Sequence, residues 1–184
     1  MDIKIELIQE LRNLFQLMEE EYERTAESYG FSCAGCEENC CSIGFTHHTV
    51  LEYELLQLGL GELSAAEREE LREKSRRALE EEGRARCPLL LEGRCRLYAY
   101  RPMVCRLHGL PHILNNPARG VLEGTGCERF ERLHPPPQGS KIDRTPLYAR
   151  FAELEKKARE IQGNPPGSRS IPRMILDMEA NPEG

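Results

Sequence analysis

Apolar residues recur at helical spacing near the start of the chain. Between residues 3 and 22 they are Ile3, Leu7, Leu11, Leu14, Met18 and Tyr22, and charged residues fill the opposite positions. Residues three and four apart share one face of a helix, so this pattern predicts an amphipathic helix. We expect the helix to end near Tyr29 and Gly30.

Two further helices are predicted in the middle of the chain from their capping residues. Thr49 has the side chain of a helix N-cap, and Gly59 closes the short apolar stretch that follows it. Ser64 and Glu67 form a capping-box pattern before a longer helix that Gly83 terminates. This longer helix has few apolar residues, so it is expected at the surface.

A small β-hairpin is predicted over residues 87–98. Two short apolar runs flank Glu92-Gly93, a pair of residues typical of a tight hairpin turn. Residues 99–134 are rich in turn-forming residues and contain Cys105 and Cys127.

In the C-terminal part of the chain, a stiff, proline-rich linker precedes a predicted helix. Thr145-Pro146 opens the helix, which runs to about Ile161. Apolar spacing over residues 171–178 predicts a segment that docks on the body of the protein. The predicted domain organisation is therefore a cysteine-containing domain at 1–134, a linker at 135–145, and a helix with a tail at 146–184.

Composition and charge narrow the class of protein. The 184 residues include 25 basic and 31 acidic side chains, and the net charge of −6 argues against a nucleic-acid partner. No apolar stretch is long enough to span a bilayer, so no membrane partner is expected. The first residues lack the three blocks of a signal peptide, which predicts a cytoplasmic protein.

Eight cysteines are the main chemical signal of the chain, and they fall into two sets of four. The first set is compact: a CxxC is followed, after three residues, by an adjacent CC pair. The second set is wider and spans residues 87–127. Two sets of four suggest four-ligand sites, and the candidate metal ligands are Cys33, Cys36, Cys40, Cys41, Cys87, Cys95, Cys105 and Cys127.

Three explanations of the cysteines compete. Disulfides need an oxidising compartment, and adjacent cysteines such as Cys40 and Cys41 pair with each other only under strain. Buried thiols pack as small apolar groups, but this does not explain a CxxC and a CC within one polar loop. Metal binding explains the spacing directly, because two intervening residues let a tight turn direct both sulfurs to one metal.

The kind of metal follows less directly from the spacing. Zinc takes four thiolates in a tetrahedron, whereas an iron–sulfur cluster takes one thiolate per iron over a larger volume. Adjacent residues rarely bind the same single ion, so Cys40 and Cys41 either serve different irons of a cluster or divide between two sites. This favours an iron–sulfur cluster or iron as the cofactor, with zinc as the close alternative.

Basic residues are concentrated around the second set of cysteines. Residues 84–108 contain six arginines and one glutamate, a local charge of about +5 in an acidic chain. Cationic neighbours stabilise thiolates, so we expect Arg101 and Arg106 to support the metal ligands, with binding of an external anion as the alternative. Other candidate ligands or supporting residues are His47, His48 and His108.

The cysteines belong to a longer pattern, formed by Cys33, Cys36, Cys40 and Cys41, Cys87-Pro88-Leu89-Leu90, Cys95-Arg96-Leu97-Tyr98, Arg101-Pro102, Cys105-Arg106 and Cys127. This pattern resembles that of the bacterial cysteine-cluster proteins of YkgJ type, whose CxxCxxCC domain is described as zinc- or iron-chelating. The resemblance covers about residues 30–130 and leaves out the flanking helices. It implies a metal chelated by these cysteines, a small irregular fold with helices, and a cytoplasmic location.

The sequence therefore predicts a mainly α protein with a small β-hairpin, an irregular cysteine-rich domain that binds an iron–sulfur cluster, iron or zinc. One alternative is a structural zinc module whose surface binds a partner protein. Another is a metal-dependent modifying enzyme, since flagellin lysine methylases resemble this chain in having a related cysteine cluster. The sequence contains no nucleotide-binding loop and no recognisable catalytic motif.

Overall fold

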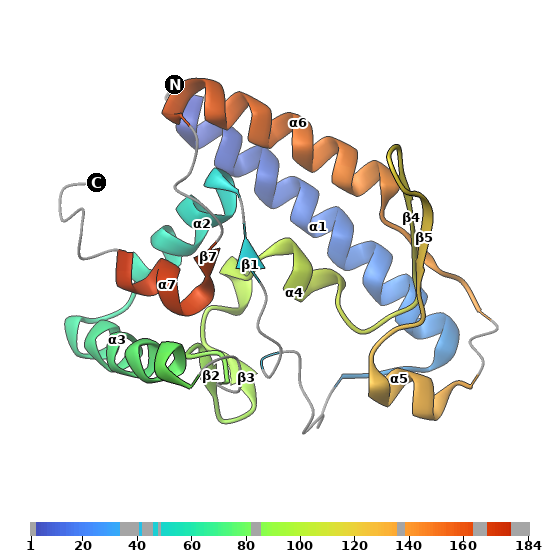
Figure 1. Cartoon of the computed structure of the whole chain (residues 1–184), viewed down its shortest axis with the longest axis horizontal. Coiled ribbons are helices and arrows are strands. Elements are labelled where there is room, and N and C mark those ends of the chain that lie inside the picture. Colours follow the sequence, from blue (N-terminus) through green and yellow to red (C-terminus); the bar gives the residue numbers. More distant parts are fainter. Residues whose placement is uncertain are drawn as a thin grey trace. The chain divides into compact units, whose positions relative to one another are not determined.

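The structure of the chain is a computed structural model, and Figure 1 shows it as helices joined by loops and short strands. It is mainly α, with small sheets among the described residues, which confirms the predicted fold class. No described helix combines the length and the apolar character needed to cross a membrane. The structure describes residues 3–33, 41, 46–47, 49–81, 86–135, 139–163 and 169–177.

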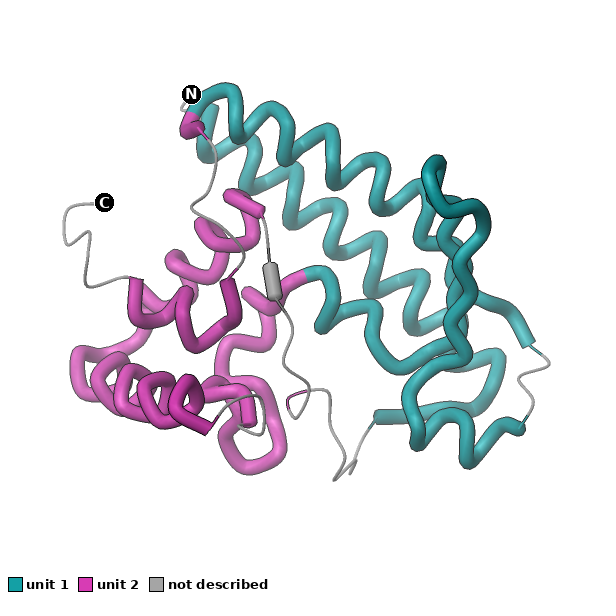
Figure 2. Tube along the Cα trace, in the orientation of Figure 1, with its two compact units in different colours: residues 1–34, 103–161 teal, residues 35–102, 162–184 magenta. Residues whose placement is uncertain are grey.

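The chain forms two compact units, and each is assembled from two separate stretches of sequence (Figure 2). Unit 1 combines residues 1–34 with 103–161, and unit 2 combines residues 35–102 with 162–184. The domain organisation predicted from the sequence follows other boundaries, and independent folding of its parts stays a prediction.

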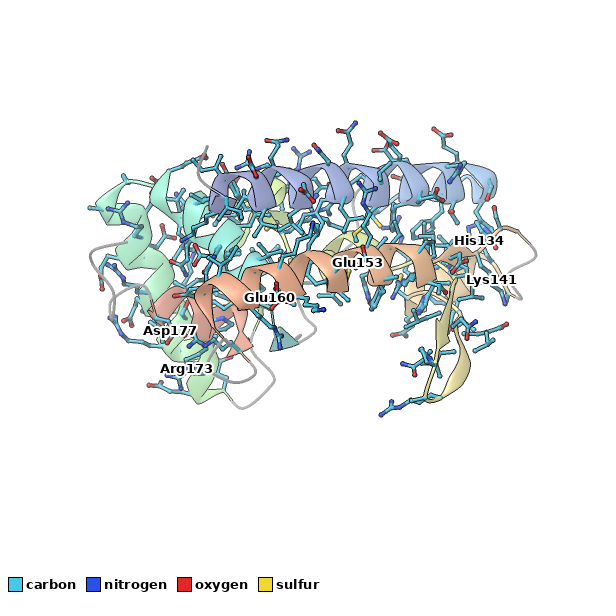
Figure 3. All side chains as sticks on the ribbon, turned by 90° about the horizontal axis from the view of Figure 1, so that it is seen from above. His134, Lys141, Glu153, Glu160, Arg173 and Asp177 are labelled. Atoms are coloured by element: carbon cyan, nitrogen blue, oxygen red, sulfur yellow. The ribbon has the colours of Figure 1, made fainter. Side chains whose placement is uncertain are left out.

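Two long helices form the body of unit 1, namely α1 (Ile3–Tyr29) and α6 (Thr145–Gln162). They run alongside each other in both views (Figures 1 and 3), and the rings of Phe15 and Phe151 stack between them at a centroid distance of 6.4 Å. Both helices are thereby confirmed as predicted. Their buried apolar residues are Leu7, Ile8, Leu11, Leu14, Phe15, Met18, Ala26, Leu147, Phe151, Leu154 and Ala158.

The rest of unit 1 holds a small sheet between two short helices. Strands β4 (His112–Asn116) and β5 (Gly120–Gly124) form an antiparallel hairpin, and β6 (Ile142–Asp143), inside the predicted linker, pairs parallel to β4. Helix α4 (Met103–Leu107) precedes the hairpin, and α5 (Glu128–Leu133) follows it.

The turn-rich residues 99–134 therefore contain strands and short helices for which the sequence analysis named no element. Strand β5 is exposed along most of its length, so its residues show no alternation of apolar and polar side chains. Backbone hydrogen bonds to β4 define it instead, and the turn before it is stabilised by Asn116, whose side-chain oxygen accepts from the N–H groups of Ala118 and Arg119 at 2.9 and 3.1 Å.

Three helices enclose the core of unit 2. They are α2 (Val50–Gly61), α3 (Ala65–Glu80) and α7 (Ile171–Leu176), and α7 packs against both others, which confirms the predicted docking of that segment. The Gln57 amide of α2 also donates to the Met174 carbonyl of α7 at 3.0 Å. The buried core consists of Leu56, Leu60, Leu71, Leu89, Leu97, Ile171, Met174 and Ile175.

Local sequence signals determine the start of α3 and the hairpin turn in unit 2, whereas α2 continues to Gly61, past the predicted end at Gly59, and Thr49 makes no side-chain cap hydrogen bond. The capping box at Ser64 and Glu67 is present, with both reciprocal hydrogen bonds. The predicted hairpin forms from β2 (Leu90–Leu91) and β3 (Arg94–Cys95), and the turn residues Glu92 and Gly93 both have positive φ, at 48° and 78°. Positive φ at both central positions is the requirement of a type I′ turn, for which Gly is favoured.

Candidate metal centre

Unit 2 brings the two cysteine motifs of the sequence together. The backbone N–H of Cys87 donates to the carbonyl of Cys41 at 2.7 Å, although 45 residues separate them in sequence. Cys87 then enters a tight turn, in which its carbonyl accepts from the N–H of Leu90 at 3.0 Å. Leu90 in turn pairs across the hairpin with Cys95. Cys41, Cys87 and Cys95 are all half-buried, and these backbone contacts connect the chain segments that carry them.

The hairpin cysteines lie at the edge of the unit 2 core. Cys87 and Cys95 pack against the buried cluster that contains Leu89 and Leu97. Successive side chains of a strand point to opposite faces. Leu91 and Arg94, beside the turn, are therefore exposed, whereas Leu90 and Cys95 are half-buried. The thiols are therefore held on a packed surface and retain partial access to solvent.

Helix α3 holds the hairpin in place through Arg96. Its guanidinium, which is 16% exposed, forms ion pairs with Glu67 and Glu70 one helical turn apart. Two hydrogen bonds with Ser64 and the Arg96 guanidinium together lower the pKa of Glu67 from 4.5 to about 2. The cap of α3 and the hairpin contact thus depend on the same carboxylate.

This pairing predicts a defined acid sensitivity of unit 2. Because the pKa of Glu67 is lower in the folded chain, its contribution to stability is complete above pH 4.5 and is lost as the pH falls toward about 2. We expect Glu67→Gln to lower the melting temperature at pH 7 and the difference from wild type to narrow below pH 4.5. Glu80→Gln at the exposed end of α3 is the control. An equal difference at pH 7 and pH 2 would contradict the assignment.

Unit 1 contains the other three described cysteines. Cys33 follows the end of α1 and is exposed, and its sulfur lies 3.1 Å from the hydroxyl of Tyr22. Cys105 lies on α4 and is half-buried. Cys127 is the residue before α5, and its N–H donates to the carbonyl of Gly109 at 3.1 Å.

The arginines near these cysteines have defined partners. Arg106, whose side chain is 4% exposed, forms an ion pair with Glu19 of α1 and lies 4.3 Å over the Phe15 ring. Arg101, in unit 2, lies 3.7 Å over the ring of Tyr98. Arg106 therefore holds α4 against α1, a structural role that the sequence pattern did not indicate.

Arg144 is a basic residue of unit 1 that the sequence analysis did not single out. Its guanidinium donates to the carbonyl of Leu107, the last residue of α4. Burial, followed by the positive charge of Arg144, lowers the pKa of His108, which keeps the ring neutral near pH 7. A neutral imidazole is the form that binds metal, so His108 stays a candidate supporting residue.

The structure also separates cysteines that the sequence groups together. Cys33 belongs to unit 1, whereas Cys41, the other described cysteine of the compact first set, belongs to unit 2. Within the part of the chain that the structure describes, no three His, Cys, Asp or Glu side chains come together as a ready metal site. Thiolate sulfur nevertheless suits both zinc and iron. The predicted ligands and supporting residues that lie outside the described side chains are Cys36, Cys40, His47 and His48.

Comparison with known proteins identifies the cysteine motifs. Residues 32–123 match the model of the CxxCxxCC family, described as a "putative zinc- or iron-chelating domain". No curated protein and no solved structure matches the chain. The family description supports metal chelation and leaves both zinc and iron open. The matched residues make up half of the chain, which therefore belongs to the CxxCxxCC family.

Proposed function

We propose that this chain binds iron, as an iron–sulfur cluster or as a single ion, through cysteine thiolates of both units, with zinc as the alternative metal. The proposed ligands in unit 2 are Cys36, Cys40, Cys41, Cys87 and Cys95, and those in unit 1 are Cys33, Cys105 and Cys127.

The Cys87-to-Cys41 backbone hydrogen bond carries this proposal. It joins Cys41 of the first motif to Cys87 of the second, and a shared metal site in unit 2 requires these two segments to lie together. Cys95 lies on β3, which pairs with β2, the strand that begins three residues after Cys87. The adjacent Cys40 and Cys41 favour a polynuclear centre, since neighbouring side chains diverge and rarely reach one ion.

Unit 1 offers thiols in a different setting. Cys33 follows α1, Cys105 lies on α4, and Cys127 precedes α5. Two contacts connect α1 with these segments, from Tyr22 to Cys33 and from Glu19 to Arg106. Bound iron would supply electron transfer at these thiolates, whereas zinc would supply structural support. The chain's own contribution is to hold the sulfurs, exclude part of the solvent and present polar hydrogens to them.

Metal and sulfide analysis of protein purified without oxygen tests the proposal. We expect bound iron with visible sulfur-to-iron absorption, and a partial loss of metal in each cysteine variant, from unit 2 in Cys95→Ser and from unit 1 in Cys127→Ser. Arg94→Ser, the neighbouring strand residue, is the control for the hairpin and should retain wild-type metal content. Circular dichroism checks that each variant is folded.

The result separates the candidate functions. Bound zinc without sulfide would establish the alternative metal. A protein that retains neither metal after reconstitution with each of them would overturn the proposal. Full metal content in both cysteine variants would exclude these two residues as ligands.

A further inference from the structure

Helix α1 lies outside the residues that match the family model, yet its side chains contact the surroundings of the cysteines in unit 1. Its C-terminal end is a complete Schellman motif: Gly30 has φ +61°, and the N–H groups of Gly30 and Phe31 donate to Glu27 and Ala26 at 3.0 and 2.9 Å. This left-handed residue reverses the chain. As a result, Cys33 returns along the helix to Tyr22, eleven residues earlier in the sequence.

Tyr22 meets a second cysteine-bearing segment at Gly109. Gly109 has φ +109°, and a Cβ atom there would stand 3.2 Å from the Tyr22 hydroxyl and 3.9 Å from the Cys127 sulfur. The Gly109 carbonyl also accepts from the N–H of Cys127 at 3.1 Å. A residue without a side chain is needed here, because both groups approach the backbone from the same side. The Tyr22 hydroxyl and the sulfurs of Cys33 and Cys127 therefore converge on one small region.

The chemistry of these groups sets the direction of the Tyr22 contact. Either atom can donate when Cys33 is a thiol. A metal-bound Cys33 would be a thiolate, which carries lone pairs and no hydrogen, so the Tyr22 O–H would then donate to its sulfur. Hydrogen bonds to ligating sulfur withdraw electron density from it and tune the potential and the electronic spectrum of a bound metal. The contact also restricts the rotamers of Cys33, which is otherwise exposed.

We propose that Tyr22 is a positioning residue of a metal site in unit 1, and that its phenol donates a hydrogen bond to the Cys33 thiolate beside Cys127. This inference rests on the proposed metal-binding function. It extends the site beyond the residues of the family pattern, into α1. The other contacts of α1 support it: Glu19 and Phe15 hold Arg106, the neighbour of Cys105, one turn or more before Tyr22.

Tyr22→Phe tests the inference because it removes only the hydroxyl. Tyr29→Phe is the matched control: Tyr29 lies on the same helix, packs against Phe130 at a centroid distance of 4.9 Å, and has a buried hydroxyl to which no described residue hydrogen-bonds. Metal content and a sulfur-sensitive signal are measured for both variants and for wild type. For an iron–sulfur centre the signal is the reduction potential, and for a single metal it is the sulfur-to-metal absorption band of the Co²⁺-substituted protein.

We expect Tyr22→Phe to keep its metal while its signal shifts, to a more negative potential or to a band at lower energy, because the sulfur regains electron density. Tyr29→Phe should match wild type. An unchanged signal in metal-loaded Tyr22→Phe would overturn this inference alone. Loss of metal from folded Tyr22→Phe would also overturn it, in favour of Tyr22 as a ligand. A wild-type protein that binds neither iron, zinc nor Co²⁺ would instead defeat the proposed function, and this inference with it.

Discussion

Removing the metal with a chelator under reducing conditions should destabilise unit 2 strongly and leave the pair formed by α1 and α6 helical. Ligands on Cys41, Cys87 and Cys95 would close loops of tens of residues, and a structural metal contributes on the order of 10 kcal/mol to folding in zinc-finger peptides. The β2–β3 hairpin is short and packs beside those cysteines, so it depends on them directly. The α1 and α6 helices belong to unit 1 and pack on each other through Phe15 and Phe151.

Hydrogen exchange measured by mass spectrometry can resolve this difference along the chain. We expect residues 86–100 to lose protection after chelation, whereas residues 7–18 of α1 keep most of theirs. Restoring the metal should restore protection of the hairpin, which controls for damage by the chelator. Unchanged protection of residues 86–100 after verified removal of the metal would rule out a structural role for it.

Local signals in the sequence predicted the longer helices and the β2–β3 hairpin, but not the short helices α4 and α5. The apolar spacing of α1, the capping box at Ser64 and the Glu92-Gly93 turn each depend on neighbours within a few residues, and the sequence shows these directly. The β4–β5 hairpin lacked such a signal, because its second strand is exposed and formed by backbone pairing. The strand Thr46–His47 pairs with Arg169–Ser170, and no local pattern predicts a partner so distant in sequence.

In the candidate site too, the sequence predicted the local features and missed those that depend on residues distant in sequence. Cysteine spacing identified the ligand candidates, since the CxxC and CC patterns are local. Their division between two units was not predictable, because the boundary after Ala34 passes through the compact first set. Tyr22 and Gly109 were missed because only the folded chain brings them to Cys33 and Cys127. A signal existed for neither residue, as a tyrosine on the buried side of an amphipathic helix is usually a core residue.

The arginines near the second set of cysteines have partners that the local charge pattern did not indicate. The excess of positive charge over residues 84–108 suggested support for thiolates, but Arg96 and Arg106 are ion-paired with glutamates of α3 and α1. These glutamates are distant in sequence, so the local charge count could not include them. Both pairs hold a cysteine-bearing segment against a helix, and the arginines thereby contribute to the position of the cysteines.

Replacing Glu19 with alanine should destabilise unit 1 by about 2 kcal/mol, since it removes the Glu19 carboxylate from its ion pair with the buried Arg106 guanidinium. Arg106 is 4% exposed and Glu19 is 36% exposed, so the loss falls below that of a fully buried pair. The ring of Phe15, 4.3 Å from the guanidinium, retains part of the interaction. We expect α4 to loosen from α1 first, because Arg106 and Leu107 are the buried residues among its five.

Urea unfolding with hydrogen exchange of residues 103–107 measures the effect. Glu23→Ala, on the exposed face of α1, is the control and should match wild type, and residues 50–61 of unit 2 should keep their protection in both variants. Equal protection of residues 103–107 in Glu19→Ala and wild type would show that the ion pair does not hold α4 in place.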